Sequence, residues 1–384
     1  MAQEPGQPAS PVAVKYLRLQ LARHVGPVVL RRLLERFRNI DAVLAASGDQ
    51  LARVKGVGPE RARAILEARQ QDQAERETAR AAEYGVRIVC LEDADYPASL
   101  RHIPDSPICL YVRGTLQRED AVAVAMVGAR RCTHYGCEQA RRFGAALAGA
   151  GFTVVSGLAR GIDGYSHEGA LAAGGRTLAV LGNGLAHVYP PEHTELAERV
   201  AASGALLTEL PLETAPEATN FPRRNRIIIG LSLGVIVVEA GRRSGALITA
   251  RLASEYNREV FAVPGRLDSH ASFGTNTMIR DGQAKLVACL EDVLDELGEV
   301  GRITRRAASE PAETPAAGDA PLPRLSTEQE LVWNAVPAQP TDLASICRGC
   351  GLSVGTVTST LTVLQLKGIV QQLPGDRFAR RAGP

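Results

Sequence analysis

The chain has 384 residues, which is enough for two or three domains at roughly 100–200 residues each. Its composition, 45% apolar and 22% charged, is that of an ordinary globular protein, and no run of about 18 apolar residues predicts a membrane span. Seven irregularly spaced cysteines and a polar start without a secretory signal predict a reduced, cytoplasmic protein. Because the net charge is only +2, nucleic acid would have to be bound by local basic clusters.

Residues 1–84 are predicted to form a helical domain, since apolar residues such as Leu30, Leu33 and Leu34 fall at helical spacing. Within it, residues 54–59 carry two glycines that permit a tight turn, and Pro59 suits the first turn of the next helix. This pattern is typical of a helix-hairpin-helix motif, whose helix start can hold a DNA phosphate. Glu60 would repel that phosphate, so a structural or partner-docking role stays open.

Residues 85–300 are predicted to form an α/β domain with a doubly wound, mostly parallel, Rossmann-like sheet. A strand is expected at 86–90, and six further apolar runs alternate with Ala-rich helical segments at 122–127, 152–155, 177–181, 205–207, 234–238 and 259–263. Such alternation is typical of a parallel sheet covered by helices on both faces. Ligands of these folds bind beyond the carboxyl ends of the strands.

Residues 301–324 are rich in Ala, Pro, Glu and Thr and are predicted to be a flexible linker. Residues 325–384 are predicted to form a winged-helix domain, with helices at 326–336, 341–347 and 353–367 and a strand pair at 369–377 turned at 374–376. The third helix is expected to expose Gly355, Thr356, Thr358, Ser359 and Thr362. Readers of the major groove usually offer Arg, Lys, Asn or Gln there, so the domain is predicted to bind protein, or DNA weakly.

Four loops rich in small residues follow predicted strands at the same edge of the sheet, at 128–136, 156–163, 182–190 and 239–246. Small residues let a backbone or a phosphate approach closely. None of the loops has the glycine spacing of a dinucleotide site or of a Walker A motif, so we expect no cofactor. Three of the loops carry arginine, which suits a run of phosphates.

The segment Phe221-Pro222-Arg223-Arg224-Asn225-Arg226 precedes an apolar helix and offers three arginines beside an aromatic ring. These side chains suit phosphate binding and base stacking. The alternative is a buried network that ties loops together, and we favour it for Asn225 and Arg226. At least one of Arg223 and Arg224 should face solvent, while Phe221 is expected in the core.

Catalytic and metal-binding patterns are weak. Asp163 and His167 share a helical face, but no nucleophile is fixed beside them, so we interpret them as bracing a loop. Ser156 and Ser244 are interpreted as loop hydrogen-bonding residues. The Cys347-x-x-Cys350 pair lacks the second Cys/His pair of a zinc site, so no metal is expected.

With these motifs the chain resembles the DNA-processing protein A family (DprA, also called Smf) from about Tyr96 to Val287, and more loosely in both flanking domains. The matching residues are Tyr96-Pro97, Leu110-Tyr111, residues 127–130, Tyr135-Gly136, residues 156–163, His167, residues 182–184, Tyr189-Pro190, residues 221–226, Glu239, residues 244–249 and residues 263–265.

The resemblance implies a recombination mediator of natural transformation that binds and protects incoming single-stranded DNA and loads the RecA recombinase, without catalytic turnover. It further implies a homodimer formed through the α/β domain, with DNA held in a positive pocket. On that basis Arg130 is the principal phosphate ligand. The full set of expected DNA-binding residues is Arg130, Arg131, Gly157, Arg160, Gly161, Tyr189, Phe221, Arg223, Arg224, Arg226, Ser244 and Gly245.

Three positions depart from the family pattern. Pro191 stands where many members have a basic residue, and Arg131 or His193 is the candidate to compensate. Ser166 replaces the usual alanine, and Gln283 resembles an insertion.

Two other functions stay open. A nucleotide phosphoribohydrolase would use the same sheet edge, but residues 240–249 lack its Pro-Gly-Gly-x-Gly-Thr order. A duplex-specific regulator would act through the winged helix. The Ser- and Thr-rich third helix of that domain counts against this function.

Overall fold

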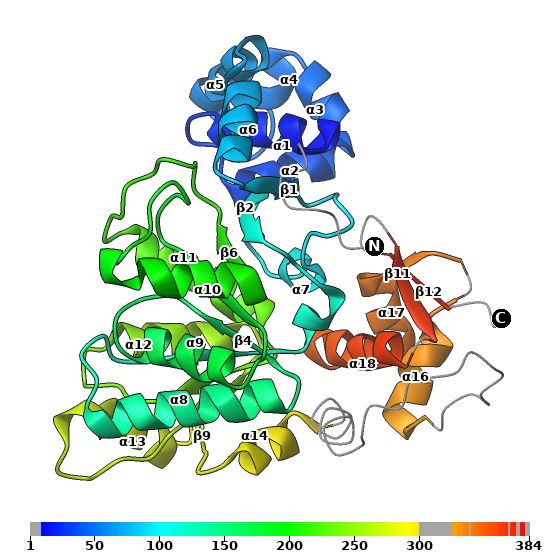
Figure 1. The fold of residues 1–384 in the computed structure, drawn as a ribbon. Coiled ribbons are helices and arrows are strands. Elements are labelled where there is room, and N and C mark those ends of the chain that lie inside the picture. Colours follow the sequence, from blue (N-terminus) through cyan, green and yellow to red (C-terminus); the bar gives the residue numbers. More distant parts are fainter. Residues whose placement is uncertain (1–8, 299–324, 338, 368, 374–376, 381–384) are drawn as a thin grey trace.

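The computed structural model describes residues 9–298, 325–337, 339–367, 369–373 and 377–380. Three bodies follow one another along the chain (Figure 1): a helical domain, an α/β domain and a winged-helix domain. The predicted fold class is therefore confirmed. The expected linker at 301–324 lies outside the described residues.

The helical domain contains α1 (Pro11–Leu21), α2 (Pro27–Phe37), α3 (Ile40–Ala45), α4 (Gly48–Ala52), α5 (Gly58–Gln70) and α6 (Gln73–Glu83). Its apolar core continues into the neighbouring sheet, where Tyr111 is completely buried. The Tyr111 hydroxyl donates to Glu77 on α6 at 2.9 Å, and the Cys109 backbone N–H donates to Gln20 on α1 at 2.7 Å. These contacts fix the helical domain to one edge of the sheet.

The α/β domain is built on nine strands: β1 (Arg87–Cys90), β2 (Cys109–Gly114), β3 (Ala123–Val127), β4 (Thr153–Ser156), β5 (Thr177–Val180), β6 (Ala205–Thr208), β7 (Gly234–Val237), β8 (Glu259–Ala262) and β9 (Lys285–Leu286). Their order is β1-β2-β6-β5-β4-β3-β7-β8-β9. From β6 to β9 the neighbours are parallel, whereas β2 is antiparallel to both β6 and β1. The seven predicted strands are present. Sequence analysis did not predict β2, or β9, which has only two residues.

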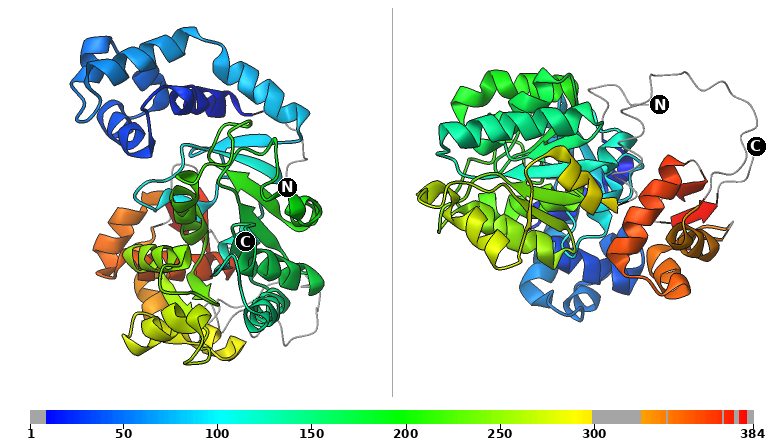
Figure 2. Two further views of the ribbon diagram at one scale, coloured as in Figure 1. Left: turned by 90° about the vertical axis from the view of Figure 1, so that its left-hand side faces the viewer. Right: turned by 90° about the horizontal axis from the view of Figure 1, so that it is seen from below.

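Helices cover both faces of the sheet (Figure 2). On one face lie α8 (His134–Gly149), α9 (Ile162–Ala172) and α10 (Thr194–Ser203), and on the other α11 (Asn220–Leu231) and α12 (Gly245–Glu255). The short helices α7 (Ala98–Arg101), α13 (Phe273–Arg280) and α14 (Leu290–Glu296) complete the domain. Because both faces are covered, the central strands from β3 to β8 are largely apolar and buried, and the strand ends are left for ligands.

The winged-helix domain contains α16 (Thr327–Ala335), α17 (Leu343–Cys350) and α18 (Val354–Leu366), with β10 (Thr341–Asp342), β11 (Val370–Leu373) and β12 (Arg377–Arg380). A capping box between Ser326 and Gln329 opens α16. The second helix was predicted to start at residue 341, which is wrong. Asp342 is its N-cap, with its side chain accepting from Ser345, and residues 341–342 instead pair with β12. The expected turn at 374–376 lies outside the described residues.

Candidate nucleic-acid interface

A pocket of about 490 Å³ opens at the carboxyl ends of β3, β4 and β7. Its walls come from the loops after these strands and from the starts of α11 and α12. Four exposed arginines line it: Arg130, Arg131, Arg242 and Arg243. Of the residues that the structure describes, none forms an ion pair with these four arginines. Asp163 also lines the pocket and interacts electrostatically with Arg130, but this single buried carboxylate leaves most of the positive charge unneutralised.

The loop after β3 carries Arg130 and Arg131 and is held in a close approach to α9. A Cβ on Gly128 would lie 2.5 Å from Ile162 Cγ1, so only glycine fits there. Gly161, with φ +75°, is equally confined, because its Cβ would meet the Ala129 carbonyl oxygen at 2.3 Å. The two predicted loops thus touch through their backbones, and this contact directs the loop to the pocket.

Glu239 also holds the loop after β3 in place. It is 1% exposed and accepts from the Thr133 backbone N–H at 2.8 Å and from the Thr133 hydroxyl at 2.7 Å. Thr133 in turn caps the N-terminus of α8, where a negative charge is stabilised by the helix dipole. Both oxygens of the Glu239 carboxylate therefore accept hydrogen bonds from Thr133 at the start of α8. A phosphoribohydrolase needs an acid that is free to react, so a carboxylate engaged in this way does not suit that function.

Arg224 forms the floor of the pocket. It is 5% exposed, and its Nη1 donates to the carbonyl oxygens of Gly157, at 2.7 Å, and Val180. A Cβ on Gly157 would collide with this guanidinium, at 2.2 Å from Nη1. Gly157 is thus required to admit Arg224. Burial lowers the pKa of Arg224 to about 10, so the side chain remains a cation at neutral pH.

The remaining residues of the 221–226 segment divide as the sequence predicted, with one exception. Arg223 is exposed. Arg226 is 8% exposed, pairs with Asp105 and Glu209, and does not line the pocket, while the Asn225 amide donates to Thr249 at 2.8 Å. The exception is Phe221, whose expected place in the core is wrong.

Phe221 is only half-buried and lines the pocket. The Arg130 guanidinium carbon lies 4.8 Å from the centroid of the Phe221 ring, and the centroids of the Tyr189 and Phe221 rings are 5.9 Å apart. The ring fits because Gly182 has no side chain, since a Cβ there would be 2.8 Å from the Phe221 ring. An arginine stacked on a partly exposed aromatic ring is a suitable platform for a nucleobase.

Of the other predicted site residues, Ser244 and Gly245 line the pocket, whereas Arg160 does not. Arg160 is exposed and paired with Glu192, whose pKa it lowers. Ser244 caps α12 by accepting from Ala246 at 3.3 Å, and a Cβ on Gly245 would meet open space. Sequence analysis did not name Arg242 and Arg243 as site residues. The arginines in the loop after β7 were the signal that could have identified them.

The residues suspected of catalysis are structural groups. His167 is completely buried, and its Nδ1 lies 2.6 Å from the Thr177 hydroxyl. Burial lowers its pKa to about 3. Asp163 accepts from the Gly157 backbone N–H at 3.1 Å, and burial raises its pKa while the charge of Arg224 works against that rise. Ser156 was expected to form a loop hydrogen bond, which is wrong: it is the last residue of β4, and its hydroxyl donates to the Met126 carbonyl of β3 at 2.6 Å.

Of the two candidates to compensate for Pro191, the structure places only Arg131 in the pocket lining. His193 is half-buried, and its Nδ1 lies 2.9 Å from the Leu158 carbonyl. Ser166 is completely buried and donates to Ile162 at 2.7 Å. Gln283 is exposed between α13 and β9.

The helix-hairpin-helix turn has the predicted backbone, with φ +85° at Gly56 and +63° at Gly58. Lys55 in the turn is exposed, but two neighbouring cations bond to the turn itself: Arg61 donates to the Gly56 carbonyl, and Arg32 of α2 donates to the Lys55 carbonyl at 3.1 Å. The side chain of Glu60 is 86% exposed at the start of α5. The helix-hairpin-helix turn therefore has fewer cations available to bind a phosphate than the sheet-edge pocket has.

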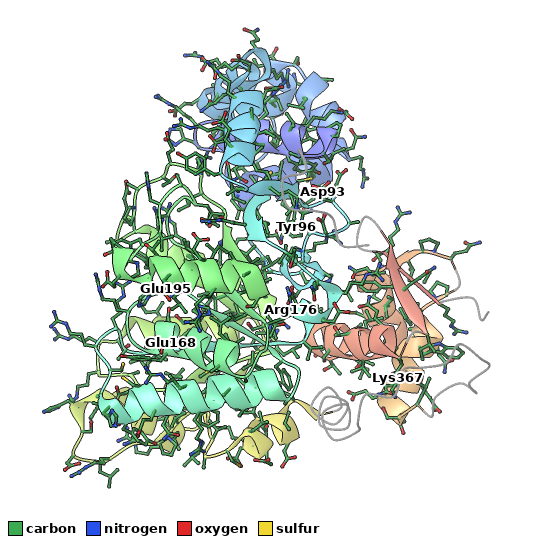
Figure 3. All side chains as sticks on the ribbon, viewed as in Figure 1. Asp93, Tyr96, Glu168, Arg176, Glu195 and Lys367 are labelled. Carbon is green, nitrogen blue, oxygen red and sulfur yellow. The ribbon has the colours of Figure 1, made fainter. Side chains whose placement is uncertain are left out.

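The third helix of the winged-helix domain, α18, is more covered than expected. The five residues expected to be exposed are all half-buried. Val363, 1% exposed, belongs to an apolar cluster of the α/β domain that includes Val122 and Phe152. The hydroxyls of Thr358, Ser359 and Thr362 donate to backbone carbonyls of the same helix. Lys367, labelled in Figure 3, donates to Gln329 at 2.7 Å. The helix presents little that could read base edges.

Within the described part of the chain, no helix is both long and apolar enough to cross a membrane. Among those same residues, no group of three or more His, Cys, Asp or Glu side chains could hold a metal ion.

Three family models match the chain: "DNA recombination-mediator protein A" at residues 87–298, "DprA winged helix domain" at 311–376 and "SAM-like Helix-hairpin-helix tandem" at 17–71. The chain is similar to Protein Smf of Synechocystis sp., with 35% identity over 93% of this chain and 96% of the relative.

Two solved structures are also similar. DNA processing protein A of Streptococcus pneumoniae has 32% identity and a TM-score of 0.63, covering 77% of this chain and 99% of that one. DNA processing protein A of Helicobacter pylori, described as having a unique single-stranded DNA binding mode, has 31% identity and a TM-score of 0.50 over 55% of this chain and 95% of that one.

Proposed function

Because this chain belongs to the DNA recombination-mediator protein A family, also called DprA or Smf, we propose that its sheet-edge pocket binds single-stranded DNA. The observation that carries the proposal is the charge of the pocket. Four exposed arginines line it, and no described residue forms an ion pair with them. A phosphate backbone supplies the missing partners, since arginine binds phosphate through paired, charge-assisted hydrogen bonds.

The aromatic side of the pocket favours a single strand over a duplex. Phe221 is partly exposed beside Arg130 and Tyr189, so a base can stack on it. In a duplex the base faces are already stacked on each other, whereas in a single strand they are free to stack on protein. The similarity to the Helicobacter pylori protein supports the same choice of ligand.

The predicted residues take different roles in this proposal. Arg130 and Arg131 are exposed in the pocket and contact phosphates directly, whereas Arg223 is exposed outside the pocket lining and contacts a phosphate beyond it. Arg224 is buried as the floor of the pocket, where Gly157 makes room for it, and Arg226 is buried outside the lining. Gly161 admits the close approach of the loop that carries Arg130. Arg160 joins the DNA only by exchanging Glu192 for a phosphate.

The proposal includes the wider role of the family. The protein acts in the cytoplasm as a homodimer through its α/β domain, protects incoming DNA in natural transformation and loads RecA onto it. It does so without a cofactor and without catalytic turnover. The buried, bonded state of Glu239, Asp163 and His167 supports the absence of turnover.

The test is fluorescence anisotropy with a labelled single-stranded oligonucleotide and unlabelled duplex as competitor. The wild type is expected to bind the single strand and to resist the duplex. Arg130→Ala should lose about 10- to 150-fold in affinity, the worth of a hydrogen bond to a charged group. Arg76→Ala is the matched control, because Arg76 is also exposed but is paired with Asp72 in the helical domain.

Loss of affinity in the control as well as in Arg130→Ala would mean that general charge, and not the pocket, binds DNA. Absence of single-strand binding, together with release of free base from a nucleoside monophosphate, would replace the proposal with the phosphoribohydrolase alternative.

A further inference from the structure

A second arginine–aromatic stack lies at the same sheet edge as Phe221. The guanidinium carbon of Arg242 is 3.9 Å from the ring centroid of Phe273, at the start of α13. We propose that Phe273 and Arg242 form a second base-stacking position, and that one single strand of DNA spans both stacks. This inference rests on the proposed function and adds to it the path of the strand.

The chemistry of the second stack matches that of the first. Arg242 lines the pocket and, within the described residues, has no ion-pair partner, so its charge is available to the strand. Phe273 is 36% exposed, which is unusual for a large aromatic side chain. A phosphate beside Arg242 and a base on the Phe273 ring would use both halves of this pair.

The position of Phe273 is fixed by the fold. The backbone N–H of the next residue, Gly274, donates to the Ala240 carbonyl at 2.6 Å, and a Cβ on Gly274 would collide with that oxygen. Further along α13, Asn276 makes two hydrogen bonds with the backbone of Gly265, at 3.0 and 2.9 Å. The loop after β7 and the start of α13 are therefore tied together, and Phe273 is held at the pocket rim.

The strand order sets the spacing of the two stacks. Phe221 packs over Gly182, which follows β5, while Arg242 follows β7 and Phe273 comes after β8. The sheet runs β5-β4-β3-β7-β8, so the stacks are three to four strand spacings apart, roughly 14–19 Å. The loop with Arg130 and Arg131 follows β3, between them. A strand that crosses this edge meets the Phe221–Arg130 stack, then the rest of the loop with Arg131, and then the Arg242–Phe273 stack.

The surface between the stacks includes an exposed apolar side chain. Ile248 on α12 lines the pocket and is 57% exposed. An aliphatic side chain in a basic pocket can contact the faces of bases without selecting among them. This composition fits binding that is independent of sequence.

The test is a length series of oligothymidylates of about 4 to 16 nucleotides, measured with the full chain. Phe273→Ala should leave affinity for the shortest oligonucleotides unchanged and should weaken the longest by about 5- to 150-fold, the usual effect of losing one stacked base. Phe273→Trp should retain the wild-type affinity. Tyr84→Ala is the matched control, because Tyr84 is a similarly exposed aromatic side chain in the helical domain.

A second readout distinguishes stacking from a structural role. With 2-aminopurine placed at successive positions of the longest oligonucleotide, the wild type should quench its fluorescence at two separated positions. Phe273→Ala should abolish one of them and leave the other. Equal loss at all lengths, or an unchanged quenching pattern, would overturn the second stack. Failure of the wild type to bind any length would overturn the proposed function instead.

Discussion

At the amino edge of the sheet, where the parallel strands begin, Arg176 lies directly before β5, and Figure 3 labels it in the α/β domain. Its guanidinium donates twice to the carboxylate of Asp120, at 2.9 Å each, and once each to the carbonyl oxygens of Thr115 and Ser203. At the carboxyl edge the situation is reversed. Arg130, Arg131, Arg242 and Arg243 are exposed, and none of them forms an ion pair with a described carboxylate.

The same residue type therefore serves two purposes in one sheet. A half-buried arginine with a hydrogen bond from each guanidinium nitrogen stabilises the folded chain, because its charge is matched where water is scarce. An exposed arginine without a carboxylate partner adds little to stability but remains available to an external anion. Variants at the two edges should separate stability from DNA affinity.

The largest expected effect is on stability, from Arg176→Met. This change leaves Asp120, whose side chain is 7% exposed, buried without its cation. Breaking such a pair costs about 3–5 kcal/mol. Denaturant unfolding should show this loss, while the variant that remains folded should bind single-stranded DNA as the wild type does. A loss of affinity with intact stability would contradict the division between the edges.

The next effect is on the salt dependence of DNA binding. Each phosphate contact on a single strand contributes about −0.7 to the slope of log affinity against log salt concentration. Arg130→Ala, Arg131→Ala and Arg223→Ala should each make the slope less negative by about that amount, and should change the free energy of unfolding by less than about 0.5 kcal/mol. The loss should be similar for all base sequences, since phosphate contacts carry no sequence information. A sequence-selective loss would mean that the residue reads bases.

A smaller effect concerns pH and His167, which contacts Thr177 at the amino edge. Its pKa is lowered to about 3 by burial, so between that value and about 6.5 the unfolded chain binds one more proton than the folded chain. Stability is therefore lost as pH falls below about 6.5, by up to about 1.4 kcal/mol per pH unit. The gap in unfolding free energy between wild type and His167→Gln should narrow at that rate. A constant gap would show that His167 titrates in the folded state.

The smallest effect is expected in the winged helix. The Thr358 hydroxyl already donates to the Val354 carbonyl at 2.8 Å, and the helix has little exposed surface. Thr358→Ala should leave affinity for both single-stranded and duplex DNA within about twofold of the wild type, since no base contact is removed. A selective loss of duplex binding in competition assays would restore the regulator hypothesis for this domain.

Most of the α/β fold could be predicted from the sequence because continuous apolar strands alternate with helices. β9 was out of reach, since two exposed residues, Lys285 and Leu286, produce no periodicity. The second helix of the winged-helix domain was placed too early because Asp342, its N-cap, reads equally well as a residue of the first turn.

The loops that form the site could be predicted from the sequence, but which of their side chains are buried could not. Sequence motifs located Arg130 and the 221–226 segment, yet they did not show that Phe221 is half-buried while Arg224 is the floor of the pocket. That outcome depends on Gly157 and Gly182, which lie far away in sequence and make room for the two side chains. The space that these glycines leave for a distant side chain arises only in the tertiary structure, so no local sequence pattern predicts it.

Photocrosslinking tests the central claim most directly. A single-stranded oligonucleotide carrying a photoreactive thymidine analogue would be irradiated with the full chain, and the crosslinked peptides identified by mass spectrometry. The account predicts crosslinks to the loop after β3, which carries Arg130, and to the start of α11, which carries Phe221. Crosslinks confined to the winged helix or to the helix-hairpin-helix turn would contradict it.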